Sequence, residues 1–156
     1  MRVGIGFDVH PFSDDPARPL VLGGVTFAGE RGLAGHSDAD VIAHAAADAV
    51  LGAAGLADIG THFPDSDPAW RGADSLRILA GVVELVAAEG WSIGNVDVSV
   101  VTEVPRLAPH RVEMGQKLGA VLRAPVSVKA KRAEGLGAIG RREGIACYAV
   151  ALLERT

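Results

Sequence analysis

Hydrophobic residues alternate with small or polar residues over the first ten positions of the chain. Val3, Ile5, Phe7 and Val9 share one face, and the other face carries Arg2, Gly4, Gly6, Asp8 and His10. A period of two is typical of a β-strand. The sequence therefore predicts a strand over residues 2–10 with two chemically different faces.

The sequence predicts five further extended segments. Gly23 and Gly24 separate residues 19–22 from 25–27, which indicates a hairpin with a glycine turn. Alternating valines predict strands over residues 96–100 and 126–130. The nearly continuous apolar run 145–153 predicts a central strand buried on both faces.

Apolar residues at helical spacing predict three helices. The first, rich in alanine, is expected over residues 38–54 with Ser37 as an N-cap. The second is expected over residues 76–87 and ends at Gly90. The third begins at Pro109 and turns inward Val112, Leu118, Val121 and Leu122. The glycine-rich or proline-rich segments 57–72 and 135–144 are expected to be loops.

The order of these elements predicts an α+β fold. We expect one domain over residues 1–156, a sandwich in which one mixed β-sheet carries helices on one face. Hydrophobic residues make up 49% of the chain and aromatic residues only 4%, so small aliphatic side chains must fill the core. The net charge of −4 argues against nucleic-acid binding through bulk charge, although a local basic pocket for a phosphorylated small molecule stays open.

Cysteine usage and hydropathy suggest a compartment. The only cysteine, Cys147, cannot form an intramolecular disulfide, and the first residues lack the apolar core of a signal peptide. No segment approaches the ~20 apolar residues of a membrane span. We expect a cytoplasmic protein without a membrane or nucleic-acid partner.

Asp8 and His10 are the first candidates for chemistry. Two residues apart on a strand, their side chains project from the same face, and zinc accepts both carboxylate oxygen and imidazole nitrogen. The pair alone also fits a surface pair near a strand end.

His44 falls four residues after Asp40 and four before Asp48, which places the three on one helix face. It is either a third metal ligand or a solvated helix residue.

Two other segments suggest anion binding, and a third by itself is only a turn-rich loop. His36 and Ser37 precede a helix, where free backbone N–H groups favour anions. Residues 58–67 form an acidic, proline-stiffened loop. Arg141 and Arg142 flank late glycines, an arrangement that is either a phosphate clamp or plain surface charge.

The ordered set of motifs resembles the 2-C-methyl-D-erythritol 2,4-cyclodiphosphate synthase family over essentially the whole chain. Each motif is weak alone, and together they are specific. They are Gly6–His10, Gly23–Val25, His36–Val41 with His44, Asp58–Gly60, Phe63–Pro68, Gly94–Asp97 and Gly140–Ile145.

The resemblance implies a lyase of the non-mevalonate isoprenoid pathway that works as a homotrimer with active sites between neighbouring subunits. The substrate would be 4-diphosphocytidyl-2-C-methyl-D-erythritol 2-phosphate. Its 2-phosphate attacks the β-phosphorus, closes a cyclic diphosphate and expels CMP. The substrate carries its own nucleophile, so the protein supplies positioning and charge neutralisation.

The resemblance also implies residue roles. Asp8, His10 and His44 would bind zinc, Glu134 would help to hold a second divalent ion, Mg²⁺ or Mn²⁺, and His36 would contact substrate. The remaining substrate-binding positions fall in three sets, for the erythritol and substrate loop, for a cytidine pocket on the adjacent subunit, and for phosphate or an axial ligand. They are Ser37, Asp58, Ile59, Gly60, Phe63, Pro64, Asp65, Ser66 and Asp67; Thr102, Pro105, Arg106, Leu107, Ala108, Lys131 and Ala133; and Arg141.

Arg132 departs from the family pattern, because relatives usually carry at this position a threonine that contacts phosphate. Arg132 either neutralises phosphate charge in its place, as a catalytic residue, or points to solvent. Two other functions stay open. A zinc-dependent phosphoesterase would release a linear phosphate, and a non-catalytic trimer that binds a cytidine nucleotide or a diphosphate would bind without turnover.

Overall fold

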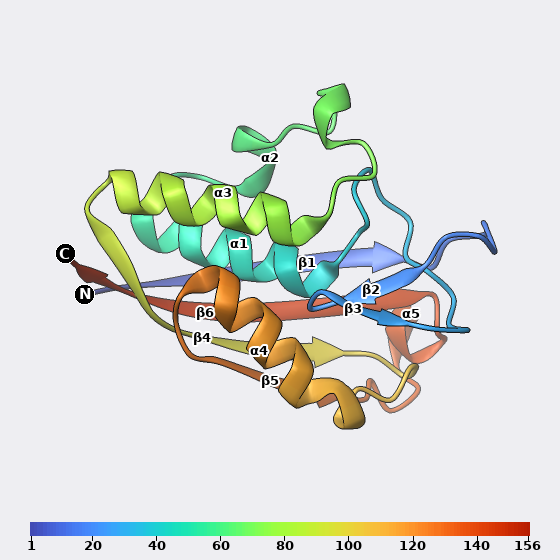
Figure 1. Ribbon diagram of the computed structural model, residues 1–156. Helices are drawn as coiled ribbons and strands as arrows, with labels where there is room; N and C mark the ends of the chain where they lie inside the picture. Colours follow the sequence, from blue (N-terminus) through green and yellow to red (C-terminus); the bar gives the residue numbers. More distant parts are fainter.

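The computed structural model describes residues 1–156 and shows a four-stranded sheet with helices on one face (Figure 1). The strand order is β1–β6–β4–β5. Strands β1 (Arg2–Pro11), β6 (Gly144–Arg155) and β4 (Trp91–Val101) pair antiparallel, whereas β5 (Val126–Lys131) runs parallel to β4. The sheet is therefore mixed, as predicted, and β1 and β5 are its two edges.

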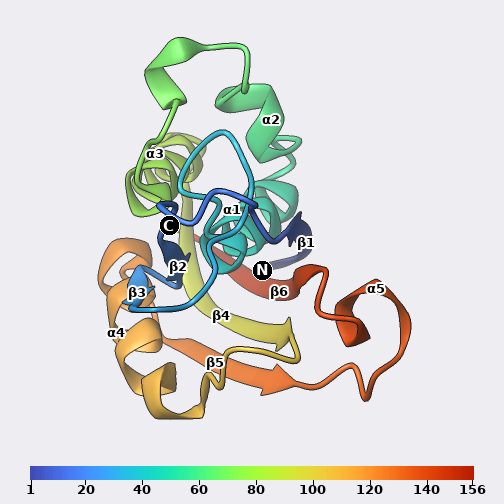
Figure 2. The same cartoon turned by 90° about the vertical axis from the view of Figure 1, so that its right-hand side faces the viewer.

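Three longer helices cover the sheet (Figure 2). Helix α1 (Val41–Ala54) lies on β1 and β6, α3 (Ser75–Ala88) packs against α1, and α4 (Arg111–Leu122) lies on β5. The predicted hairpin is also present as a separate two-stranded sheet of β2 (Leu20–Leu22) and β3 (Val25–Phe27). Both turn glycines have positive φ, 57° and 73°, as a tight hairpin turn requires.

The segments expected to be loops contain single helical turns. Residues 57–72 include α2 (Ile59–His62) and the 3₁₀ turn η1 (Pro68–Trp70), and residues 135–144 include α5 (Gly137–Gly140). Another 3₁₀ turn, η2 (Ala108–His110), precedes α4, so α4 begins at Arg111 rather than at Pro109. In a helix that begins at Arg111, Val112 lies on the outer face and is 72% exposed. The prediction that Val112 turns inward is therefore wrong.

The N-cap of α1 is Asp40 rather than Ser37. Its carboxylate accepts from the backbone N–H groups of Ile42 and Ala43 at 3.1 and 3.2 Å. The same carboxylate accepts from Gly23 and Gly24 at 2.8 and 2.7 Å, which ties the hairpin to the start of the helix. Asp40 is fully buried, so the prediction that it flanks His44 on a polar helix face is wrong.

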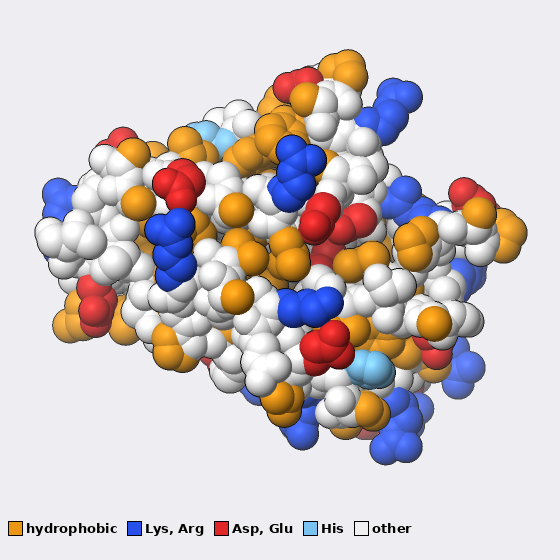
Figure 3. All heavy atoms as spheres, in the orientation of Figure 1, with side chains coloured by type: hydrophobic (Ala, Val, Ile, Leu, Met, Phe, Trp, Pro, Cys, Tyr) orange, Lys and Arg blue, Asp and Glu red, His pale blue; other side chains and the backbone are white.

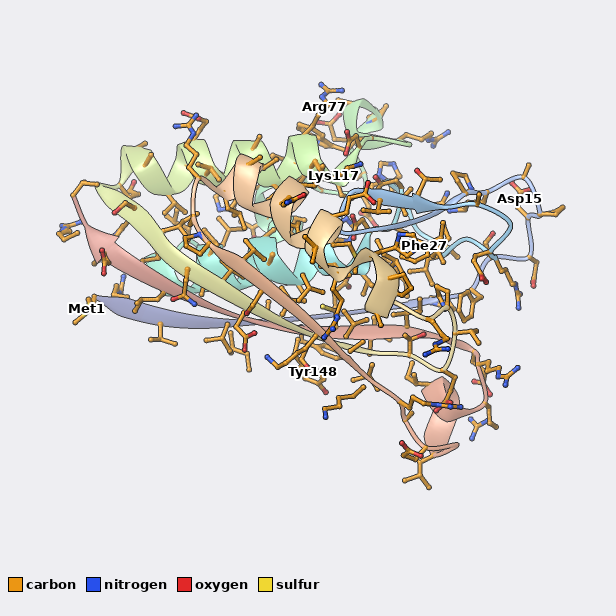
Figure 4. All side chains as sticks on the ribbon, turned by 60° about the horizontal axis from the view of Figure 1, so that its bottom comes forward. Met1, Asp15, Phe27, Arg77, Lys117 and Tyr148 are labelled. Carbon is orange, nitrogen blue, oxygen red and sulfur yellow. The ribbon has the colours of Figure 1, made fainter.

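One face of the sheet carries no helix. Val3, Ile5, Phe7 and Val9 of β1 lie on this open face and are 47–71% exposed, while Gly4 and Gly6 face α1. Strand β6 alternates in the same way. Tyr148, on the helix-free side in Figure 4, is 47% exposed, so β6 is not buried on both faces within one chain.

The surface over α3 and α4 mixes positive and negative side chains with hydrophobic ones and shows no large patch of one sign (Figure 3). None of the helices combines the length and the apolar composition that crossing a membrane would need.

Candidate active site

Asp8, His10 and His44 form a compact cluster of ligand atoms. Strand β1 presents Asp8 and His10 toward α1, and the first turns of α1 present His44. Asp8 Oδ2 lies 3.0 Å from His10 Nε2 and 3.0 Å from His44 Nδ1, and the two imidazole nitrogens are 3.3 Å apart. The three side chains are 12–23% exposed, so the cluster is sheltered but reachable.

Two glycines of β1 allow the helix to come this close. A Cβ atom at Gly4 would lie 2.1 Å from Ala49 O, and one at Gly6 would lie 2.0 Å from Ala45 O. Any larger residue would therefore push α1 away from the strand. The space that side chains would fill at these positions is taken by the helix backbone, which carries His44 to Asp8.

The outer nitrogens of both imidazoles already have partners. His10 Nδ1 donates to the carbonyl oxygen of Ala34 at 2.8 Å, because a carbonyl can only accept. In the neutral imidazole this leaves the lone pair on His10 Nε2, the nitrogen that faces the cluster. His44 Nε2 lies 2.9 Å from Ser75 Oγ, with Nδ1 toward Asp8. Such partners are typical of histidines that bind metals.

The charges within the cluster are strongly coupled. Burial by itself would raise the pKa of Asp8, yet hydrogen bonds from His10 and His44 hold it well below its usual range. Burial likewise works against a charged His10, but the Asp8 carboxylate raises the pKa of that imidazole above its usual value. One carboxylate oxygen and two imidazole nitrogens fit a zinc-type ion with an open coordination position. The three ligand atoms all lie within 4.8 Å of one another.

A cavity of about 480 Å³ opens onto this cluster. Of the residues predicted to bind substrate, the ones that line it with the cluster are His36, Ser37, Ile59, Gly60, Phe63 and Asp65. Sequence reasoning missed Gly35, Trp70 and Ile78 in its wall. The Trp70 ring packs edge-on against the Phe63 ring, with the ring centroids 5.0 Å apart. The only feature of the sequence that could have indicated a role for Trp70 is that it is an aromatic residue in the proline-rich loop.

Asp58 and Asp67 have local structural roles in the same loop. Asp58 caps α2 by accepting from Thr61 N at 2.9 Å, and Asp67 caps η1 by accepting from Ala69 N at 2.9 Å. Neither these two residues nor Pro64 and Ser66 line the cavity.

A second cavity, of about 370 Å³, lies where β4 and β5 end. It gathers nearly the whole predicted cytidine set, namely Thr102, Pro105, Arg106, Leu107, Ala108 and Lys131, together with Arg132. Of that set, only Ala133 is absent from the lining. Glu103 also lines it. Arg132 donates from Nε and Nη2 to Glu103 Oε2 at 3.0 and 2.8 Å. The Glu103 side chain is 4% exposed and the Arg132 side chain 67% exposed.

Neither Glu134 nor Arg141 lines the cavity at the metal cluster. Glu134 follows β5 with φ of 55°, while Asp8 and His10 belong to the opposite edge strand. Three interstrand steps separate these edges, or about 14 Å. Arg141 is exposed and donates from Nε to Glu143 at 2.6 Å. A cavity of about 670 Å³ along α4 and β5 is lined by none of the candidate metal ligands.

Comparison with known proteins agrees with this geometry. The model of the YgbB family matches residues 1–154. A 2-C-methyl-D-erythritol 2,4-cyclodiphosphate synthase from Symbiobacterium thermophilum is 55% identical over 156 residues, covering 98% of each chain.

Two solved structures are similar along nearly the whole chain. The bifunctional IspDF from Campylobacter jejuni superimposes with a TM-score of 0.94 at 39% identity, over 99% of this chain and 42% of that one. IspF from Plasmodium falciparum in complex with CDP superimposes with a TM-score of 0.86 at 35% identity, over 99% of this chain and 96% of that one.

Proposed function

The chain belongs to the YgbB family, and from that membership we propose how its two cavities share the work of one active site. The protein is a CMP-releasing lyase of isoprenoid biosynthesis. It converts 4-diphosphocytidyl-2-C-methyl-D-erythritol 2-phosphate to 2-C-methyl-D-erythritol 2,4-cyclodiphosphate. We propose that residues 1–156 form a single domain for this reaction.

The reaction is an intramolecular phosphoryl transfer. An oxygen of the substrate's 2-phosphate forms a bond to the β-phosphorus, the bond between that phosphorus and the bridging oxygen of CMP breaks, and CMP leaves with that electron pair. No protein nucleophile is needed, so the chain must hold both phosphates in line and offset their charge.

The Asp8–His10–His44 cluster is the observation that carries the proposal. We assign it to zinc, which when bound polarises a diphosphate oxygen as a Lewis acid. Ser37 and His36 line the same cavity, and we assign to them contacts with the phosphates. Phe63 and Trp70 line the cavity on the side of loop 57–72, where their rings exclude water from it.

The second cavity is proposed to bind the cytidine part. Its loop, residues 102–108, offers backbone groups and apolar side chains for a base, and Lys131 and Arg132 offer positive charge. The solved relative with bound CDP supports a cytidine-linked ligand. Glu103 takes two of the five N–H groups of Arg132, so three remain for a phosphate oxygen. Glu134, close in sequence, is proposed to help hold a second divalent ion.

We propose a homotrimer because the two half-sites of one chain lie at opposite edges of its sheet. A neighbouring subunit can bring its second cavity to the metal cluster of the first. The open sheet face supports this assembly. Its exposed apolar residues are the kind that an interface buries, and Phe7 and Tyr148 stack there with centroids 4.9 Å apart.

Subunit complementation tests the shared site. His44→Ala removes a ligand of the first cavity, and Lys131→Glu reverses a charge in the second, so each variant alone should be inactive. Refolding an equal mixture should restore about a quarter of the wild-type sites, because three-quarters of random cyclic trimers contain one intact site of three. No recovery in mixed trimers would overturn the shared site. Phosphorus NMR should show the cyclic diphosphate and CMP, and a linear phosphate product would identify hydrolysis instead.

A further inference from the structure

One wall of the cavity at the metal cluster is a segment, residues 33–37, that lies outside the helices and strands. Residues 35–37 line the cavity. A Cβ atom at Gly35 would lie 3.0 Å from Cε1 of His10, so the segment packs directly against the cluster. Soon after it comes Ala39, whose φ of 57° is unfavourable for a residue with a Cβ atom. A strained backbone of this kind keeps its shape only where other groups hold it.

Arg18 holds both ends of segment 33–37. Its Nε donates to the carbonyl oxygen of Leu33, and its Nη2 donates to the carbonyl oxygen of Ser37 at 2.5 Å. No other group of the chain donates to either oxygen. Leu33 is 1% exposed and Ser37 6% exposed, so water has little access to them. The planar guanidinium, with its donors in fixed directions, therefore spans the segment as a clamp.

A second arginine provides a natural comparison. Gly32 passes so close to Arg18 that a Cβ atom at Gly32 would lie 2.4 Å from the Arg18 carbonyl oxygen, which fixes Arg18 beside the segment. Arg31 ties the same two loops together, because its Nε donates to the carbonyl oxygen of Ser13 at 2.6 Å. The hydrogen bonds of Arg31 go to residues 13–14 and not to segment 33–37. Only Arg18 thus holds the wall of the cavity.

We propose that Arg18 is a positioning residue for the reaction, which clamps segment 33–37 and thereby holds His36 and Ser37 where they meet the phosphates of the substrate. Arg18 does not line the cavity, so it acts through the segment. The inference rests on the proposed roles of His36 and Ser37. Without the guanidinium, two buried carbonyl groups lose their donor, and the segment must shift to satisfy them. A misplacement of about 1 Å typically costs about 10²-fold in rate.

Turnover by Arg18→Ala, with Arg31→Ala as the matched control, tests this role. Arg18→Ala should lower kcat by about 10²-fold. Its affinity for CMP should stay at the wild-type value, because the proposed cytidine cavity lies at the ends of β4 and β5, and this binding also shows that the variant is folded. Arg31→Ala should keep a kcat close to that of wild type. Near-normal kcat in Arg18→Ala, or an equal loss in Arg31→Ala, would overturn the inference.

Rescue experiments separate the clamp from a role of charge alone. Guanidinium ion reproduces the forked donors that Arg18→Ala removes, so adding it at low concentration should restore part of the lost kcat. Methylammonium has the same charge without the fork and should restore none. Arg18→Lys should also stay impaired, because the lysine ammonium is a point charge that cannot span both carbonyl groups. Equal rescue by the two cations, or normal kcat in Arg18→Lys, refutes the clamp.

Hydrogen exchange gives a readout that does not depend on activity. The backbone N–H groups of Ala34 and Asp38 donate to Pro11 and Ala73 at 2.8 and 3.0 Å, and both lie at or beside the clamped segment. They should exchange faster in Arg18→Ala than in wild type or Arg31→Ala. Unchanged exchange at both amides contradicts the clamp. Faster exchange together with a wild-type protein that does not turn over the proposed substrate refutes the proposed function and not the clamp.

Discussion

Gly6 is a point where the strand and helix that build the metal cluster nearly touch, and Gly6→Ala tests the dependence of the site on that contact. The new Cβ would lie 2.0 Å from Ala45 O and 2.6 Å from Ala49 N. Both are backbone atoms of a buried helix and cannot rotate away. Since ordinary contact begins at 3.4 Å, α1 must retreat from β1 by about 1.4 Å.

His44 precedes Ala45 and moves with the helix. Metal–ligand distances tolerate shifts of only about 0.2 Å, so Gly6→Ala should abolish zinc binding. Overpacking a rigid contact should also lower the free energy of unfolding by about 1–3 kcal/mol. Urea unfolding and zinc titration measure the two effects separately.

Gly52→Ala is the matched control on the same helix. Its Cβ would meet nothing closer than Ile5 O at 3.8 Å. This variant should keep zinc binding and gain up to about 1 kcal/mol of stability, because alanine favours the helix. A Gly6→Ala protein with wild-type stability and zinc affinity would refute the claim that the glycines set the geometry of the cluster.

Three other outcomes follow from the structure. If Arg132 contacts the diphosphate, Arg132→Ala should reduce the turnover rate by about 10²-fold or more, whereas near-normal rates in both Arg132→Ala and Arg132→Thr would exclude a charge role. Zinc affinity should fall as pH drops through the raised pKa of His10, by about tenfold per pH unit for each proton displaced, and a flat titration profile would contradict this competition. Tyr148→Glu on the open sheet face should yield monomers that light scattering detects and that lack activity, and an intact trimer would place the interface elsewhere.

Local periodicity was sufficient to predict the strands of the large sheet, the three longer helices and part of the site. Alternation put Asp8 and His10 on one face of a strand, because a period of two is a property of the extended backbone itself. The glycine pair between two short strands fixed the hairpin for the same local reason. The cytidine set was predicted by family resemblance, and six of its seven residues gather around one cavity.

Ser37 and Arg132 show where local signals were insufficient. Ser37 satisfied the spacing rule for an N-cap, but α1 begins at Val41 and Asp40 caps it. The same carboxylate accepts two backbone N–H groups of the distant hairpin, a contact that no local pattern predicts. Arg132 forms an ion pair with Glu103, 29 residues away, and no local sequence pattern predicts that pair. The contact of Ser75 with His44, 31 residues away, was missed because the two side chains meet only where the start of α3 lies against α1.

The chain alone determined which residues of β1 share a face, and only the tertiary structure decided which face is buried. The apolar face of Val3 to Val9 is open in the single chain, and the glycine face lies against α1. Alternation carries no information on the partner of each face. Here the decisive factor is close backbone approach, because only glycine lets a helix lie near enough to the strand for His44 to reach Asp8.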